Sequence, residues 1–129
     1  MSDQIFASPN IREIVNSIIH PVVREDFIAW AKKHSSHSLI FNEAAILFES
    51  GSDTLCDYII TVVSDLKTKV KRIIARDGIS EQEILSRMKH QYDDDFKIKK
   101  SNFVIQNNNL KYTRSQVNTI YNILNNLKK

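Results

Sequence analysis

The stretch DYIITVVSDLKTKVKRIIARDG, residues 57–78, changes its pattern halfway along. It begins with a continuous run of mostly β-branched apolar residues, Tyr58–Val63, which is typical of a strand covered on both faces in a parallel sheet. A helix is predicted from about Asp65 to Arg76, because apolar residues then recur on one helical face. These residues are Leu66, Val70, Ile73 and Ile74. The stretch therefore predicts a strand that leads directly into a helix.

Two other apolar runs have the same continuous character, SLIFNE at 38–43 and NFVIQN at 102–107. Helical patterns lie between and after these strand candidates. Ser80 with Glu83 has the spacing of a capping box, and so has Thr113 with Gln116, which we expect to open a long amphipathic terminal helix. Alternating strands and helices predict an α/β protein with a parallel sheet flanked by helices.

The N-terminal part has helical periodicity with a proline in its middle. Ser8 is a candidate N-cap and Pro9 suits the first helical position. We expect Pro21 to interrupt this helix near His20, because a proline disfavours helical geometry in the residue before it. A second helix is expected over 21–34, and its predicted buried residues are Val23, Phe27 and Trp30.

Length and composition indicate one ordinary globular domain of 129 residues with a net charge of +3. This small basic excess does not by itself indicate a nucleic-acid partner. The single cysteine, Cys56, excludes an internal disulfide and fits a reducing compartment. No apolar run approaches the roughly 20 residues that a membrane span needs, and MSDQIF lacks the layout of a signal peptide. We expect a cytoplasmic protein.

Two histidines, His34 and His37, stand three residues apart, as metal ligands can. They lie in the polar segment KKHSSHS without a supporting cysteine or carboxylate pattern, so no metal site is predicted.

Three arginines frame a predicted turn at Asp77-Gly78. Arg72 and Arg76 are one helical turn apart, and Arg87 lies on the helix that follows the turn. Arginine forks bind phosphate oxygens through paired hydrogen bonds, so this arginine ladder suggests a polyphosphate site. The neighbouring lysines can equally be the solvated face of the helix; they are Lys67, Lys69 and Lys71.

Five segments resemble dephospho-coenzyme A kinases in order and spacing, from about Ile5 to the C-terminus. They are IIHPVVREDF (18–27), EAAILFESG (43–51), CDYIITVV (56–63), KVKRIIARDGISEQEILSRMKHQ (69–91) and KIKKSNFVIQNNN (97–109). The resemblance implies a P-loop kinase fold and transfer of the γ-phosphoryl group of ATP, with Mg²⁺, to the 3′-hydroxyl of dephospho-coenzyme A. That reaction is the last step of coenzyme A synthesis.

The resemblance also implies roles for individual residues. A mobile lid would span about 76–100, and Glu49 and Gly51 would shape a loop. Arg72 would stack on adenine, Arg76 would reach the phosphates, and Arg87 would neutralise charge in the transition state. Asn107 would lie beside the adenine. The region that receives dephospho-coenzyme A would contain His20, Pro21 and Arg24.

The phosphate loop of that family, G-x-x-x-x-G-K-[ST], does not occur in the 129 residues, whose only glycines are Gly51 and Gly78. The expectation is therefore the C-terminal two-thirds of such a kinase, inactive by itself, with exposed sheet edges that favour self-association. The alternative is a non-catalytic module that binds a nucleotide or coenzyme A. Asn102 replaces the family's usual aspartate, and Asn109 stands where a glycine is common, which a left-handed asparagine would tolerate.

Overall fold

The computed structural model describes residues 9–127, which form two compact units, one up to Asn42 and one from Glu43. The first unit contains helix α2 (Pro9–Lys33) and the irregular segment that follows it. The expected cap at Ser8 lies outside the described residues. A single domain over all 129 residues stays a prediction.

Helix α2 runs through Pro21 without interruption, so the expected break near His20 is wrong. Proline has a helical φ, and its cost is one lost backbone hydrogen bond and a local clash. The carbonyl that loses its partner is that of Ser17, an exposed residue, so water can reach it. Val23 and Trp30 are 60% and 45% exposed rather than buried, because the described part of the first unit, residues 9–42, has no second helix or strand to cover this face.

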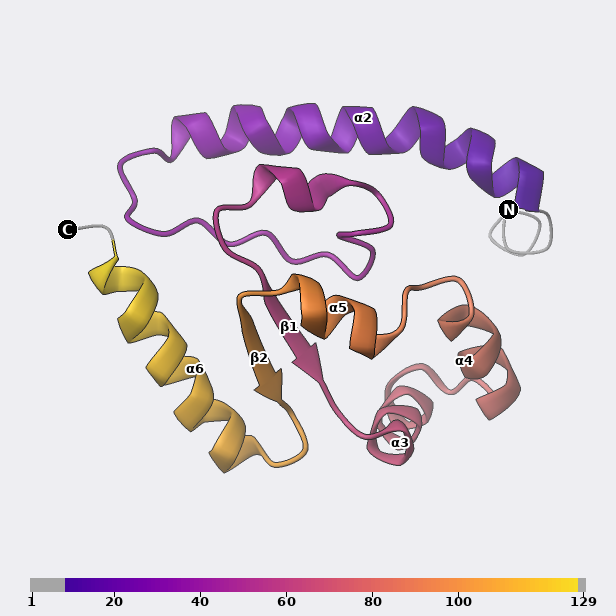
Figure 1. The fold of residues 1–129 in the computed structure, drawn as a ribbon. Helices are drawn as coiled ribbons and strands as arrows, with labels where there is room; N and C mark the ends of the chain where they lie inside the picture. The colour runs from indigo at the N-terminus through magenta and orange to yellow at the C-terminus, as the bar shows by residue number, and fades with distance from the viewer. Residues whose placement is uncertain (1–8, 128–129) are drawn as a thin grey trace. The chain divides into compact units, whose positions relative to one another are not determined.

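The second unit is an α/β arrangement around a two-stranded parallel sheet (Figure 1). Ile60 pairs with Phe103 and Val63 with Gln106. The predicted class, a parallel sheet flanked by helices, is confirmed. The elements are a 3-10 helix η1 (Ser52–Leu55), β1 (Ile60–Val63), α3 (Leu66–Asp77), α4 (Glu81–Met88), α5 (Asp94–Lys100), β2 (Phe103–Gln106) and α6 (Leu110–Asn126).

The strand expected at 38–43 is absent, and this segment is irregular. Apolar character alone does not make a strand, because a strand also needs a neighbour that pairs with its backbone. Within residues 9–127, β1 pairs with β2 alone. Segment 38–43 therefore does not pair with β1, and the other edge of β1 has no strand beside it in this part of the chain, in line with the exposed sheet edges expected from the sequence.

The core of the second unit lies partly where α5 and α6 meet the sheet and partly between α3 and α4 (Figure 1). Helix α6 packs along β2, α5 packs against β1, and α3 contacts α4. Ile84 of α4 is only 1% exposed, which shows that α4 is anchored by its apolar face. The buried apolar side chains are Val63, Val70, Ile84, Ile105, Ile120 and Leu124.

Asparagine side chains join the chain at both ends of the strand pair. The Ile59 N–H donates to Asn102 Oδ1 at 2.8 Å, before the strands begin. After they end, the Asp65 N–H donates to Asn108 Oδ1 at 3.1 Å. Asn102 thus offers the acceptor oxygen that an aspartate in its place would offer.

Helix α6 begins earlier than predicted. Asn109 is its N-cap, in an extended rather than left-handed conformation (φ −132°), and its side chain accepts from the Tyr112 N–H. The expected capping box at Thr113 and Gln116 is therefore wrong. Gln116 instead exchanges two hydrogen bonds with the backbone of Gln106, at 2.9 and 3.0 Å, and so fixes α6 to the end of β2.

A largely buried ion pair joins the loop before β1 to α5. Glu49 and Lys97 have side-chain exposures of 14% and 15%, and their charged atoms are 3.3 Å apart. Glu49 Oε1 also accepts from the Tyr92 N–H at 2.7 Å, and Lys97 Nζ donates to the Ala45 carbonyl at 3.2 Å. Glu49 therefore shapes this loop, as expected, through contacts distant in sequence.

We predict that Lys97→Met destabilises the second unit by about 3 kcal/mol, because it leaves the Glu49 carboxylate buried without its cation. Adding Glu49→Gln should recover most of this loss, since glutamine can still accept from Tyr92. Urea unfolding of both single variants and the double variant measures the effect. A double variant less stable than Lys97→Met would contradict this interpretation.

Candidate functional site

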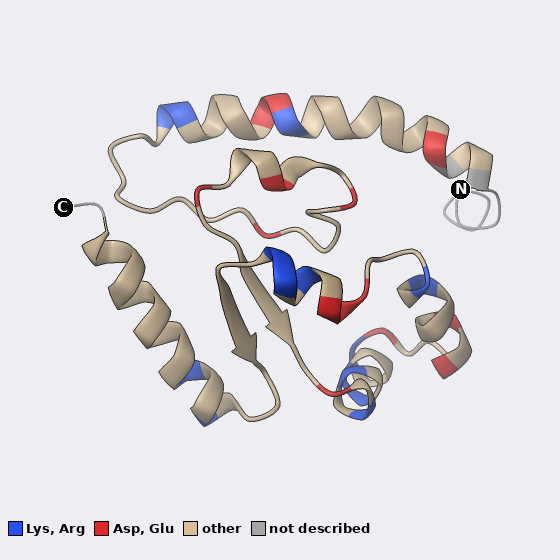
Figure 2. Cartoon of the chain, viewed as in Figure 1, with Lys and Arg blue, Asp and Glu red and all other residues tan. Residues whose placement is uncertain are grey.

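The candidate site lies at the tight turn that joins α3 to α4. Gly78 caps α3 in the left-handed conformation (φ 67°), and its N–H donates to the Ile74 carbonyl, which confirms the predicted turn. The capping box of Ser80 and Glu83 then starts α4, also as predicted. Figure 2 shows basic residues gathered on α3 and on the later part of α5, with acidic residues at the start of α5.

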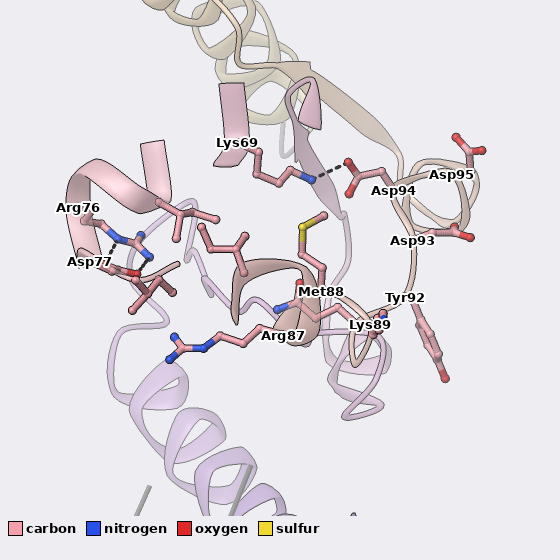
Figure 3. A pocket seen from close by; sticks show the side chains of 14 residues that line it. Lys69, Arg76, Asp77, Arg87, Met88, Lys89, Tyr92, Asp93, Asp94 and Asp95 are labelled. Atoms are coloured by element: carbon pink, nitrogen blue, oxygen red, sulfur yellow. Dashed lines mark hydrogen bonds and ion pairs between the residues drawn. The ribbon is translucent and has the colours of Figure 1, made fainter. Parts of the chain in front are cut away.

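A pocket of about 750 Å³ opens between α3, α4 and the start of α5 (Figure 3). Apolar side chains such as Ile73 and Ile84 form part of its wall, and charged groups surround them. The basic members are Lys69, Arg76, Arg87 and Lys89, and the acidic members are Asp77, Asp93, Asp94 and Asp95. In Figure 3, Asp93 and Asp95 point away from the arginines.

Arg76 makes a paired hydrogen bond with its neighbour Asp77. Its Nε donates to Oδ1 at 2.7 Å and its Nη2 to Oδ2 at 2.9 Å. These bonds hold the pKa of Asp77 below its usual range, and the positive charges of Arg76 and Arg87 act in the same direction. The Arg76 side chain is 75% exposed, so solvent screens this pair and a ligand can reach it.

Arg87 approaches the same side of the pocket from α4. Its side chain extends toward the end of α3, where Arg76 and Asp77 lie (Figure 3). Farther along α3, Lys69 Nζ is 2.8 Å from Asp94 Oδ2 and so ties α3 to α5. The pocket therefore brings two of the three predicted arginines together.

Arg72, the third predicted arginine, does not line this pocket. Its guanidinium donates to the backbone carbonyls of Asn107 and Asn108, which follow β2. Arg72 thus lies beside Asn107, the other residue assigned to the adenine by resemblance. Asn107 Oδ1 accepts from Thr113 Oγ1 at 3.1 Å, which fixes its side chain against α6.

The residues assigned to the acceptor side all lie on α2, in the first unit. They are His20, Pro21 and Arg24; His20 and Arg24 are one helical turn apart and half-buried, whereas Pro21 is exposed.

Residues 9–127 contain no group of three histidine, cysteine or carboxylate side chains placed to hold a metal ion. Among the helices that the structure describes, none is long and apolar enough to span a bilayer. Burial raises the pKa of the Cys56 thiol, with help from the nearby Asp53 and Asp57 carboxylates, which disfavours the reactive thiolate.

Sequence reasoning missed the acidic side of the site. Asp77 looked like a turn residue, yet its carboxylate binds Arg76. Its position gave a signal, because an acidic residue in the last turn of a helix opposes the helix dipole and needs another reason to be there. The Lys69–Asp94 pair gave no such signal in the sequence, because no local pattern links residues that are 25 positions apart.

The family model of CoaE, dephospho-CoA kinase, matches residues 1–112. The dephospho-CoA kinase of Leptospira interrogans is 30% identical over 125 residues, which are 96% of this chain and 60% of that protein. The dephospho-CoA kinase of Porphyromonas gingivalis is 44% identical over 87 residues, 67% of this chain and 43% of that protein. The chain thus spans 60% or less of the length of these curated relatives.

The fold is also similar to a solved structure. The crystal structure of TT1252 from Thermus thermophilus superposes with a TM-score of 0.80, at 23% identity, over 95% of this chain and 63% of that chain.

We predict that α4 loses stability in acid through its capping box. The Ser80 N–H donates to the Glu83 carboxylate and lowers the pKa of Glu83, helped by the Ser80 hydroxyl. A lowered folded pKa gives stability that is present above the ordinary glutamate pKa and is lost as pH falls through the folded value. Amide exchange of Ile84 should therefore accelerate from about pH 6 to about pH 3, relative to its intrinsic rate. Glu83→Gln, which keeps an acceptor without a charge, should remove much of this pH dependence; equal pH dependence in both proteins would contradict the prediction.

Proposed function

Because the chain belongs to the dephospho-CoA kinase family, we propose that it forms the nucleotide-lid and acceptor side of a kinase that phosphorylates dephospho-coenzyme A. The reaction transfers the γ-phosphoryl group of ATP to the ribose 3′-hydroxyl. The observation that carries the proposal is the presence of Arg76 and Arg87 in one pocket, on the two sides of the Gly78 turn. Phosphoryl transfer depends mainly on positioning and charge stabilisation, which arginines supply.

Arg76 and Arg87 bind the phosphates in this proposal. Each guanidinium can donate two parallel hydrogen bonds to phosphate oxygens. Arg87 is on α4, within the proposed lid of about 76–100, so closure of the lid would bring it onto the charge that develops during transfer.

Arg72 and Asn107 form the adenine side. Arg72 uses N–H groups in the plane of its guanidinium to bind the carbonyls of Asn107 and Asn108. Bonds in that plane leave the flat face of the guanidinium available, and such a face stacks well on an aromatic ring. The position after the end of a parallel strand is also where α/β sheets bind ligands.

The acceptor dephospho-coenzyme A is assigned to α2, with His20, Pro21 and Arg24 as its contacts. Mg²⁺ would accompany ATP and neutralise phosphate charge.

The 129-residue polypeptide by itself is proposed to be inactive, because it contains no G-x-x-x-x-G-K-[ST] sequence to cradle the phosphates. This absence also favours a second candidate function, a non-catalytic module that binds a nucleotide or coenzyme A. We place the protein in the cytoplasm as a single domain. Val62, on β1, is 56% exposed, and this strand has a free edge within residues 9–127, which supports self-association there.

We predict that the polypeptide alone forms no coenzyme A from ATP and dephospho-coenzyme A, and that activity appears when an N-terminal segment with the G-x-x-x-x-G-K-[ST] sequence that the family resemblance implies is fused to it. In that fusion, Arg76→Ala should lower kcat/KM by about 100-fold, because a charge-stabilising donor is lost.

Lys67→Ala is the matched control, since it removes a cation from the exposed side of the same helix and should change kcat/KM less than about threefold. Activity of the unfused polypeptide, or an Arg76→Ala fusion as active as the unsubstituted fusion, would contradict the proposal. Binding of ATP without turnover by the fusion would favour the non-catalytic module.

A further inference from the structure

We propose that the Asp77 carboxylate competes with phosphate for Arg76. It stays bound to the Arg76 guanidinium until a polyphosphate displaces it. This inference rests on the proposed function, because it takes Arg76 as a ligand of ATP phosphates. It adds a residue that controls how strongly the nucleotide binds.

The geometry of the pair is that of an arginine bound to an oxyanion. Two neighbouring nitrogens of Arg76, Nε and Nη2, meet the two oxygens of one carboxylate at 2.7 and 2.9 Å. A phosphate group offers oxygens to the same fork, so carboxylate and phosphate exclude each other from these two donors. Figure 3 shows this pair on the side of the pocket toward which Arg87 extends.

The stability of α3 does not explain why an aspartate occupies this position. Asp77 is the last residue of α3, next to the helix carbonyl ends, where a negative charge is unfavourable. Gly78, not Asp77, caps the helix. The contacts that favour the ionised carboxylate are with Arg76, and the charge of Arg87 adds to them. The carboxylate is thus matched to the arginines.

The pair is also suited to exchange. Arg76 is 75% exposed, so an incoming phosphate can reach its guanidinium without opening the core. The two residues are adjacent in sequence, so the Asp77 carboxylate remains close to Arg76 after their hydrogen bonds break and can bind it again. If a phosphate can use this donor pair only in molecules in which Arg76 has left Asp77, its apparent affinity is its intrinsic affinity multiplied by the fraction of such molecules.

The test is an affinity measurement on the full 129-residue chain, by NMR titration with ATP and with adenosine. Asp77→Asn should tighten ATP binding about threefold to tenfold, because Arg76 no longer has to leave a charged partner. Adenosine affinity should be unchanged, since adenosine has no phosphate to reach Arg76. Asp77→Ser should give the same gain, which separates loss of the carboxylate from an effect of the new amide.

Two further variants distinguish competition from simple charge repulsion. Asp95→Asn removes the same charge from the same pocket but from a side chain that points away from the arginines, and should change ATP affinity less than twofold. In an Arg76→Ala background, Asp77→Asn should no longer tighten ATP binding. A gain that persists in this background would overturn the inference.

The proposed function and the inference fail in different ways. If Arg76→Ala does not weaken ATP binding, Arg76 is not a phosphate ligand and both are wrong. If Arg76→Ala weakens binding while Asp77→Asn and Asp77→Ser do not tighten it, the inference alone is wrong.

Discussion

Because β1 and β2 run parallel, the chain leaves both strands at the same edge of the sheet, and the segments that follow them must meet there. After β1 the chain enters α3, and after β2 it passes through Asn107 and Asn108. Two contacts join these segments, Asp65 to the Asn108 side chain and Arg72 to both carbonyls. The start of α3 is thereby fixed, and α3 carries Arg76 to the Gly78 turn that leads into α4.

Positive and negative side chains are balanced in number around the pocket beside α3. The pocket between α3, α4 and α5 holds four basic and four acidic side chains. Lys69 with Asp94 joins two elements, whereas Arg76 with Asp77 joins neighbours on the surface. The first pair can hold the pocket together, and the second can open without loss of tertiary structure. In the proposed phosphate site, the Lys69–Asp94 pair would keep the shape of the pocket and the Arg76–Asp77 pair would exchange with the ligand.

The sequence allowed prediction of elements whose signals are local. The β-branched run at Tyr58–Val63, the helix after it and the capping box at Ser80 all formed as expected. The prediction of a strand at 38–43 was wrong because a strand also needs a neighbouring strand that pairs with its backbone. The prediction of a helix break at Pro21 was wrong because an exposed helix can continue through a proline. The arginines were identifiable by spacing, but Asp77 as the partner of Arg76 required coordinates, since side-chain direction is not readable from sequence.

A crystal structure would show directly whether ATP lies across the carboxyl ends of β1 and β2 and reaches into the pocket of α3 and α4, as we propose. The chain fused to a P-loop segment would be crystallised with a non-hydrolysable ATP analogue. We expect adenine against the guanidinium face of Arg72 near Asn107, with phosphate oxygens within hydrogen-bond distance of Arg76 and Arg87. A nucleotide bound elsewhere, with Arg76 still paired to Asp77, would contradict this proposal.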